Sequence, residues 1–469
     1  MSDRIITGGR PMGKTEQSWC KAVSCGTGTT VLSLLLSKPL NITHLHNALQ
    51  NLQNSHPILA SKITYSSAAG AAAFSLIIPS TPVPPFKLNS FPLSSTSKLL
   101  PTSNNAVSLS HLHIIHEHEM NINPWSIPNL SSTSSSSGVP VFFGSLYELP
   151  EGKCAVVFRL HTAVCDRTTA VGVLRELKEL MKEVEMENSC FGKVSLVIED
   201  LVPVGKAKKA IWAHGLDILG YSVNSLRFTN LKFKDVSEPR CSQVVRLQLS
   251  KQDTSQILAD CKLRGIKLCG ALAAAGVMAA QSGQRNSGDP LQYKQNSVGN
   301  KYAIVTLTDC RTDLEPPLSS HNFGFYHSAI MTMHVVKRGE TVWDLAERIY
   351  TSLSNSKLSN KHFTDMSDLN FLMCKAIENP SLTPHSSLRT SLMCVFEDTV
   401  VDNSESQFGL EDFIGCASTH GVGPSIAVFD TIRDGKLDIV FVYPSPLHSR
   451  EQMGRMVEEM KRVLVEGRT

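Results

Sequence analysis

A histidine and an aspartate five residues apart are the residues of this sequence best placed to do chemistry. His161 follows an apolar run at residues 154–160, and Asp166 precedes a stretch with helical spacing. A neutral imidazole held in one orientation can take a proton from a hydroxyl or an amine during acyl transfer. Asp166 could help to hold it, directly or through a buried arginine. The alternative is a histidine at a strand end that only hydrogen-bonds a neighbouring loop.

Other reactive side chains are weaker candidates. Cys165 lies beside Asp166, but nothing near it in the sequence would activate a thiol, so a small buried cysteine is the expected role. The sequence has no GxSxG, HExxH or GxxxxGK[ST] pattern and no usable GxGxxG. We interpret the segment at 106–118 as a strand. It contains four histidines: His111, His113, His116 and His118. No metal is expected there, because no further ligand stands at a recognisable spacing.

The segments around the motif predict a strand, a turn and a helix. Residues 141–149 and 154–160 are expected to form a hairpin, and a helix is expected at 169–185. Asp166 is well suited to cap that helix, because its carboxylate can accept hydrogen bonds from the first free N–H groups. Elsewhere, apolar patterns predict strands at 29–36, 243–249, 302–308, 392–396, 425–431 and 437–443, and helices at 43–53, 250–264, 268–281, 366–378 and 452–465. Ser250 can cap the helix at 250–264, and the small residues of the helix at 268–281 suit close packing. Another helix is expected to begin near Thr341, where Thr341 and Asp344 form a box-like capping pair. This order predicts an α/β (α+β) architecture with mixed sheets.

Composition limits the classes of protein that remain. The chain has 469 residues, which favours two lobes, and we place them at 1–190 and 241–469 with a connection at 191–240. A net charge of +3 predicts neither a nucleic-acid nor a membrane surface. Twelve cysteines without a CxxC pair, and an N-terminus without an apolar signal segment, indicate a reducing compartment, so a cytoplasmic location is expected.

Several segments share their order and spacing with one family. From the N-terminus they are RPMGKTEQSW, TTVLSLLL, THLHNALQNLQNSHPILASKI, HTAVCDRTTA, VTLTDCRTDLEPPL, HNFGFY and GKLDIVFVYPSPLHSREQMGRMVEEMKRVL. Together they resemble the CoA-dependent acyltransferase superfamily. This group includes plant BAHD acyltransferases, alcohol acetyltransferases, polyketide-associated acyltransferases and peptide-synthetase condensation domains. The resemblance covers nearly the whole chain.

The resemblance implies two chloramphenicol-acetyltransferase-like lobes with a channel between them, entered by acyl-CoA and by a small-molecule acceptor. It implies no bound cofactor and a monomer. It also implies that Asp166 is structural and pairs with Arg311, an ion pair whose disruption would cost ~3–5 kcal/mol. By the same resemblance, five residues of the second half are candidates for substrate binding: Arg311, Asn322, Gly324, His327 and His420.

The motif departs from the family pattern at its base. The family motif HHxxxDG uses its second histidine as the base, and Thr162 stands at that position here, with His161 at the first and Arg167 in place of the glycine. Moving one residue along an extended segment turns a side chain to the opposite face, so His161 need not face the channel. The plant DFGWG motif is missing, and the nearest late loop is 418–425, with His420.

Three functions therefore stay open. The protein could be an acyltransferase that uses His161, or one that relies on positioning and oxyanion stabilisation. It could be a repurposed enzyme that acts on a metabolite without CoA, with His161, His327 or His420 as the acid–base group. It could also be a non-catalytic binding protein that retains the fold.

Overall fold

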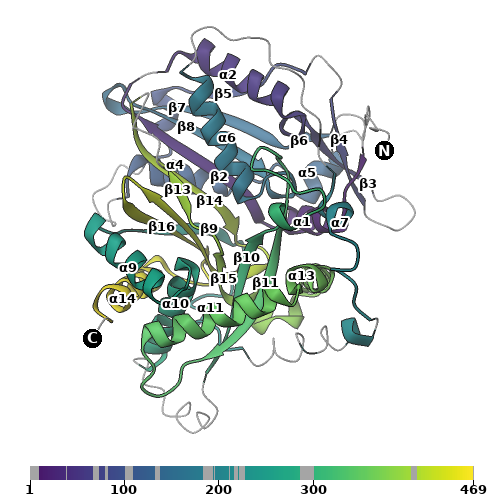
Figure 1. Cartoon of the computed structure of the whole chain (residues 1–469). Coiled ribbons are helices and arrows are strands. Elements are labelled where there is room, and N and C mark those ends of the chain that lie inside the picture. The colour runs from purple at the N-terminus through teal and green to yellow at the C-terminus, as the bar shows by residue number, and fades with distance from the viewer. Residues whose placement is uncertain are drawn as a thin grey trace. The chain divides into compact units, whose positions relative to one another are not determined.

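The structure, a computed structural model, describes most of the chain and divides it into two compact units (Figure 1). The described residues are 10–38, 40–66, 73–79, 83–100, 109–132, 138–182, 194, 196–210, 212–215, 220, 228–285, 300–402 and 409–467. Unit 1 comprises Met1–Leu201, Arg311–Tyr326 and Ser404–Ser418. Unit 2 comprises Val202–Cys310, His327–Asn403 and Thr419–Thr469. Two short segments of the second half of the chain thus belong to unit 1, which a division by position along the sequence could not anticipate.

Unit 1 is built on a five-stranded mixed sheet. Its order is β14 (Leu410–Thr419), β2 (Thr27–Leu36), β8 (Cys154–His161), β7 (Phe142–Glu148) and β5 (Leu88–Phe91). Strand β8 is antiparallel to both β2 and β7, whereas β5 is parallel to β7. The predicted strand at 29–36 and the predicted hairpin are therefore confirmed.

Helices cover both faces of this sheet. Helices α2 (Ile42–Ser55) and α6 (Arg167–Leu180) contribute Leu49 and Val173 to one apolar core with Phe158 of β8. Helix α4 (His111–Met120) covers the opposite face, where its Glu119 pairs with Arg159. Because side chains alternate along a strand, residues 157, 159 and 161 of β8 point towards the α4 side.

Smaller elements complete unit 1. An antiparallel sheet has the order β1 (Arg10–Pro11), β4 (Ala73–Ile77), β3 (Lys62–Ser66) and β6 (Val139–Pro140). The remaining helices are α1 (Lys14–Ser24), α3 (Leu93–Thr96), α5 (Ile127–Ser132) and α7 (Ile198–Leu201). Glu199 of α7 accepts a hydrogen bond from Thr15 N at 2.6 Å, which satisfies a free N–H group at the start of α1.

The predicted strand at 106–118 is wrong, because part of this segment forms helix α4. Ser110 caps the helix by accepting a hydrogen bond from His113 N at 3.3 Å. Leu112, Ile115 and Glu119 are buried at a spacing of three and four residues, which is the helical period. The alternating histidines fit the two-residue period of a strand, because histidine can be counted as either polar or apolar. Among the described residues, no group of three or more His, Cys, Asp or Glu side chains could hold a metal ion.

Unit 2 contains a seven-stranded mixed sheet. Its main order is β11 (His327–Val335), β10 (Lys301–Asp309), β12 (Arg389–Phe396), β15 (Gly423–Arg433), β16 (Lys436–Ser445) and β9 (Cys241–Gln248), and β13 (Val400–Asp402) pairs with β15. The pairs β10–β12 and β12–β15 are parallel, and the pairs β11–β10, β15–β16 and β16–β9 are antiparallel.

A helical layer packs on one face of this sheet. It consists of α9 (Lys251–Leu263), α10 (Leu268–Arg285), α11 (Val342–Leu358) and α14 (Arg450–Glu466), and α12 (Lys361–Thr364) and α13 (Met366–Glu378) follow α11. The small residues of α10 permit the predicted close packing, since a Cβ atom added at Gly270 would lie 3.1 Å from the carbonyl oxygen of Ala346. Ser250 and Thr341 cap α9 and α11 as predicted.

Several elements were not predicted from their residues, among them α1, β11 and β14. Among the described residues, no single helix is long and apolar enough to cross a membrane. One bent pair of helices, Lys251–Leu263 and Leu268–Gly283, has the length and composition of a membrane-spanning segment, and these are the only two criteria it meets.

Candidate functional site

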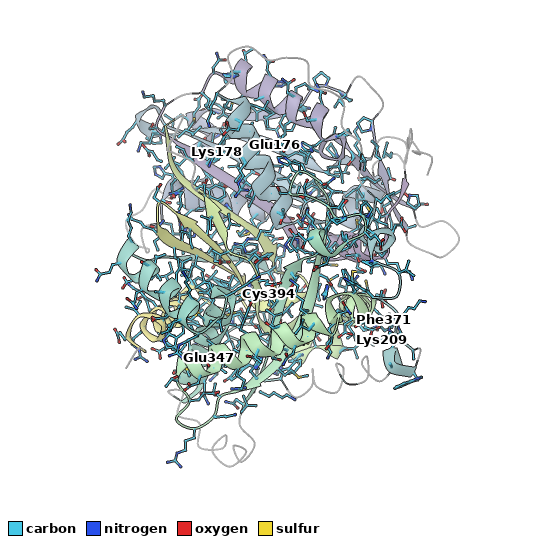
Figure 2. All side chains as sticks on the ribbon, viewed as in Figure 1. Glu176, Lys178, Lys209, Glu347, Phe371 and Cys394 are labelled. Carbon is cyan, nitrogen blue, oxygen red and sulfur yellow. The ribbon has the colours of Figure 1, made fainter. Side chains whose placement is uncertain are left out.

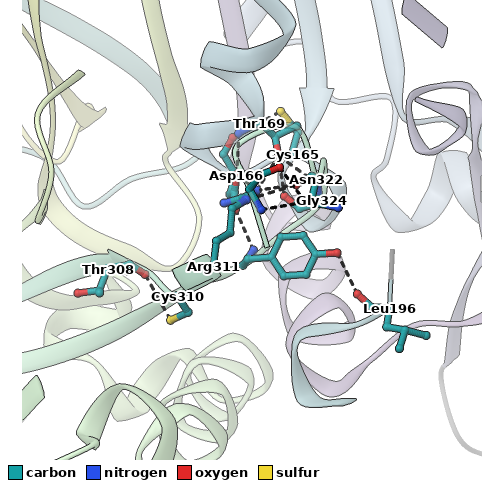
Figure 3. Close-up of polar contacts among 11 residues, drawn as sticks. Cys165, Asp166, Thr169, Leu196, Thr308, Cys310, Arg311, Asn322 and Gly324 are labelled. Atoms are coloured by element: carbon teal, nitrogen blue, oxygen red, sulfur yellow. Dashed lines mark hydrogen bonds and ion pairs between the residues drawn. The ribbon is translucent and has the colours of Figure 1, made fainter. Parts of the chain in front are cut away.

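A buried polar cluster of unit 1 is centred on the carboxylate of Asp166 (Figure 3). Asp166 caps α6, and its Oδ1 atom accepts a hydrogen bond from Thr169 N at 2.8 Å. Arg311 reaches the same carboxylate with both terminal nitrogens, at 2.9 and 3.0 Å. Tyr326 N donates to Oδ2 at 2.8 Å. The side chains of Asp166 and Arg311 are 0% and 3% exposed, so this is a buried bidentate ion pair, and the predicted pairing is confirmed.

Arg311 also organises the chain around it. Its Nη2 atom donates to Thr169 Oγ1 at 3.1 Å and to the carbonyl oxygen of Asn322 at 3.1 Å. The guanidinium carbon lies 4.9 Å from the centre of the Tyr326 ring. These contacts join the start of α6 to residues 311–326, so the carboxylate of Asp166 acts as a structural anchor.

Asn322 and Gly324 lie in this same cluster. The Asn322 side chain accepts hydrogen bonds from the backbone and hydroxyl of Ser319 at 2.9 and 3.0 Å. The backbone of Gly324 donates to and accepts from Thr169 Oγ1, at 3.0 and 2.9 Å. Gly324 has φ of 154°, and an added Cβ would lie 2.7 Å from the Tyr326 ring, which explains the glycine. Binding of substrate by Asn322 or Gly324 stays a prediction.

His161 ends β8 on the α4 side of the sheet. It is 1% exposed, and the Trp125 ring lies edge-on to it with 5.1 Å between ring centres. Its Nδ1 atom accepts a hydrogen bond from Ala163 N at 3.1 Å. A backbone N–H group can only donate, so the neutral imidazole carries its proton on Nε2. Burial lowers the pKa of His161 to about 3.

Thr162 points the opposite way. Its hydroxyl donates to the carbonyl oxygen of Gly28 at 2.5 Å and lies 3.1 Å from Thr30 Oγ1. Thr30 pairs with Leu160, whose side chain belongs to the core on the other face of the sheet. The two candidate positions therefore diverge, as the alternation of an extended segment predicts. Its hydroxyl proton is already donated, so Thr162 is no substitute for a histidine base.

Cys165 is buried beneath the anchor. It is 1% exposed, and its Sγ atom lies 3.7 Å from the carbonyl oxygen of Asp166. Burial raises the pKa of the Cys165 thiol well above its ordinary value, and the charge of Asp166 adds to this effect. A thiol in these surroundings is not a nucleophile at neutral pH, which supports the structural interpretation.

His327 and His420 belong to unit 2. His327 begins β11, is 5% exposed and lies edge-on to Phe396 with 6.0 Å between ring centres. His420 is half-buried, and its Nδ1 atom lies 3.0 Å from Ser242 Oγ, which accepts a hydrogen bond from Thr419 N. Burial, helped by the charge of Arg389, lowers the pKa of His420 to about 4. A part in chemistry for His327 or His420 stays a prediction.

Two supporting residues were not identified from the sequence. Arg389 is buried, and it donates to the carbonyl oxygens of Thr419, Gly421 and Pro424, which fixes the loop that carries His420. Thr169 bridges Arg311 and Gly324 in unit 1, and its position three residues after the helix cap was the only available signal. No pattern in the sequence points to Arg389, since its acceptors are backbone groups.

The fold is similar to several solved structures along almost its whole length. TRI3 trichothecene 15-O-acetyltransferase from Fusarium sporotrichioides aligns with a TM-score of 0.70 and 11% identity, over 98% of this chain and 95% of that chain. Polyketide synthase associated protein 5 from Mycobacterium tuberculosis aligns with a TM-score of 0.61 and 16% identity, over 97% of each chain. The first condensation domain of the CDA synthetase aligns with a TM-score of 0.59 and 14% identity, over 99% and 97%.

No family model and no curated protein sequence matches this chain. At the identities of the solved structures, the likeness concerns the fold alone. The expected α/β (α+β) class with mixed sheets is confirmed, and a specific likeness to the BAHD family stays a prediction. The chain therefore has the mixed α/β fold that acetyltransferase and condensation domains share.

Proposed function

We propose that this protein is an acyltransferase that moves an acyl group from a CoA thioester to an amine or hydroxyl of a small metabolite. Acyl-CoA would be a co-substrate, and no resident cofactor would be needed. The observation that carries this proposal is the buried Asp166–Arg311 pair, which holds the turn after His161 as the acyltransferase resemblance implies. The likeness of the whole fold to an acetyltransferase supports it.

The geometry of His161 favours donation of a hydrogen bond over acceptance of a proton. With Nδ1 occupied by Ala163 N–H, the Nε2–H group can donate to the oxygen that becomes negative when a thioester is attacked. Without a base from the chain, an amine is a better acceptor than a hydroxyl, because general-base help is worth ~10²–10⁴-fold. The amine nitrogen would attack the thioester carbon, and the carbon–sulfur bond would break. The ammonium proton would then pass to the departing thiolate, which leaves an amide and free CoA.

A second candidate is a binding protein that retains this fold without turnover. One observation favours it. Thr162 stands at the position of the family base, and its hydroxyl donates a hydrogen bond to the carbonyl oxygen of Gly28. A protein that keeps the Asp166–Arg311 pair but lacks the catalytic base is expected when a fold is retained after its enzymatic activity has been lost. Binding of an acyl-CoA or a metabolite with no release of CoA would support this candidate.

Release of CoA by the purified protein tests the two functions. A panel of acyl-CoAs would be combined with amine and alcohol acceptors. We expect turnover with an amine in the wild type, reduced by about 10²-fold or more in His161→Asn. Asparagine keeps an acceptor for Ala163 N–H but lacks a group at the place of Nε2, so it separates chemistry from local structure.

Two further variants complete this test. His118→Ala removes an exposed histidine of α4 and should leave turnover at the wild-type rate. Thr162→His restores the family base, and its folding would be checked by thermal unfolding. CoA release that is absent from the wild type but present in Thr162→His would contradict the proposed activity and indicate a natural loss of the base.

A further inference from the structure

Residues 319–326 dock along one face of helix α6, and the contacts extend well beyond the Asp166 anchor. Positions 166, 169, 172 and 176 of α6 lie on one face of the helix, because they are spaced by three or four residues. Asp166 and Thr169 hold Gly324 and Tyr326, as described above. Glu176 lies ten residues beyond Asp166, which corresponds to about 15 Å along the helix. The docked segment therefore has a second attachment point, far from the first.

The middle of this contact is tightly packed. A Cβ atom added at Gly172 would lie 2.6 Å from the Phe323 ring, so the ring rests directly on the helix backbone. The imidazole of His56, at the end of α2, stacks on Phe323 with 3.7 Å between ring centres and 14° between planes. Phe323 is 3% exposed. The ring is thus enclosed between α6 and His56.

Glu176 connects two histidines across this contact; Figure 2 shows it on α6. Its Oε2 atom lies 2.6 Å from His56 Nε2, and its Oε1 atom lies 3.1 Å from His321 Nδ1. Burial alone would raise the pKa of Glu176, but the hydrogen bonds and charges of His56 and His321 hold it below its ordinary value. An ionised carboxylate accepts only, so both imidazoles must donate to it. Glu176 thereby joins the end of α2, α6 and residues 319–326.

We propose that Glu176 is a positioning residue that clamps residues 319–326 onto α6 and thereby keeps the Arg311–Asp166 anchor in register. His56 is 14% exposed and Glu176 is 23% exposed, so their hydrogen bond is partly shielded from water. His321 is 77% exposed, so its share is smaller. Any effect of Glu176 on turnover rests on the proposed function, whereas its effect on the docked segment does not.

Hydrogen–deuterium exchange on the full-length protein tests this proposal without any substrate. The informative amides are Gly324 N, which donates to Thr169, and Tyr326 N, which donates to Asp166. We expect Glu176→Ala to speed their exchange by about tenfold, because local opening replaces two hydrogen bonds with water. Glu176→Gln should recover most of the protection, since an amide can still bond a neutral imidazole.

The control is Glu179→Ala on the same helix, because the Glu179 side chain is 65% exposed and pairs with Lys182 at 2.6 Å. It should leave exchange of residues 319–326 at the wild-type rate. If Glu176→Ala does not fold, His321→Ala is a milder variant that should speed exchange by about threefold.

Two results would overturn the clamp. Exchange in Glu176→Ala at the wild-type rate would mean that the Arg311 anchor alone holds the segment. Equal exchange in Glu176→Gln and Glu176→Ala would mean that hydrogen bonding by residue 176 is irrelevant. Both results are independent of CoA release, so failure of the clamp and failure of the proposed activity can be told apart.

Discussion

Replacement of Arg311 by methionine should destabilise unit 1 strongly. The variant leaves the Asp166 carboxyl group buried without its charged partner, in a side chain that is 0% exposed. Methionine fills a similar volume, so the change removes charge and hydrogen bonds with little loss of packing. The magnitude can be worked from the described contacts.

Asp166 loses the two donors supplied by Arg311 and keeps the backbone donors Thr169 N and Tyr326 N. A hydrogen bond to a charged group contributes about 1.5–3 kcal/mol, so two give about 3–6 kcal/mol. Removal of one partner of a buried ion pair costs about 3–5 kcal/mol in general. The two estimates agree, and we expect a loss of about 3–5 kcal/mol in the free energy of unfolding.

Urea denaturation followed by tryptophan fluorescence and by far-ultraviolet circular dichroism would measure this loss. Trp19 and Trp125 belong to unit 1, and Trp212 and Trp343 belong to unit 2. Variants that retain the tryptophans of only one unit can therefore assign each transition to its unit. The unit 1 transition should move to lower urea in Arg311→Met. A double variant with Asp166→Asn should lose at least ~2 kcal/mol less than the sum of the single variants, because the two side chains interact directly.

A loss below about 1 kcal/mol in Arg311→Met would refute this reasoning, because that is the usual value of a surface ion pair. Strict additivity in the double variant would refute it as well. Either result would mean that the packing of residues 311–326, and not the ion pair, holds the motif.

Two further predictions concern acid stability and close packing. Burial lowers the pKa of His161 to about 3, whereas an unfolded histidine titrates near ~6.5. Between these pH values the unfolded state binds more protons than the folded state. The free energy of unfolding therefore rises with pH there, by up to ~1.4 kcal/mol per pH unit. His161→Asn should reduce the slope of unfolding free energy against pH by that amount between about pH 4 and 6, and an unchanged slope would contradict the burial argument. Gly172→Ala should cost about 1–3 kcal/mol, because its Cβ would overlap Phe323. Gly454→Ala, in open space on α14, should instead stabilise by up to ~1 kcal/mol, and equal melting shifts in the two variants would count against the Phe323 contact.

Elements with a strong local pattern could be predicted from the sequence. The hairpin before the motif, the cap at Asp166 and the capping pair Thr341 and Asp344 all depend on residues within a few positions of one another. Helix α4 could not, because its histidines satisfy a period of two as well as a period of 3.6. Burial against β2 and β8 decides between these periods, and burial depends on the whole unit.

The candidate site divides in the same way. The residues themselves identified His161 and Asp166, and the family resemblance added Thr162 and implied the pairing with Arg311. The assignment of the proton to Nε2 of His161 needed the position of Ala163 N–H, which only the folded turn supplies. The roles of Thr169 and Glu176 needed the docked segment.

The sequence by itself determined the strands and helices with clear periods, the caps of α6, α9 and α11, and the motif that contains His161 and Asp166. These follow from steric preferences and hydrogen bonds between near neighbours, which act at short range along the chain. The tertiary structure brings Asp166 to Arg311 across 145 positions, as the resemblance implied. It alone decided that His161 faces α4 while Thr162 faces Gly28. Such contacts depend on which segments the core brings together, and the energy of burial that selects them belongs to the folded unit as a whole.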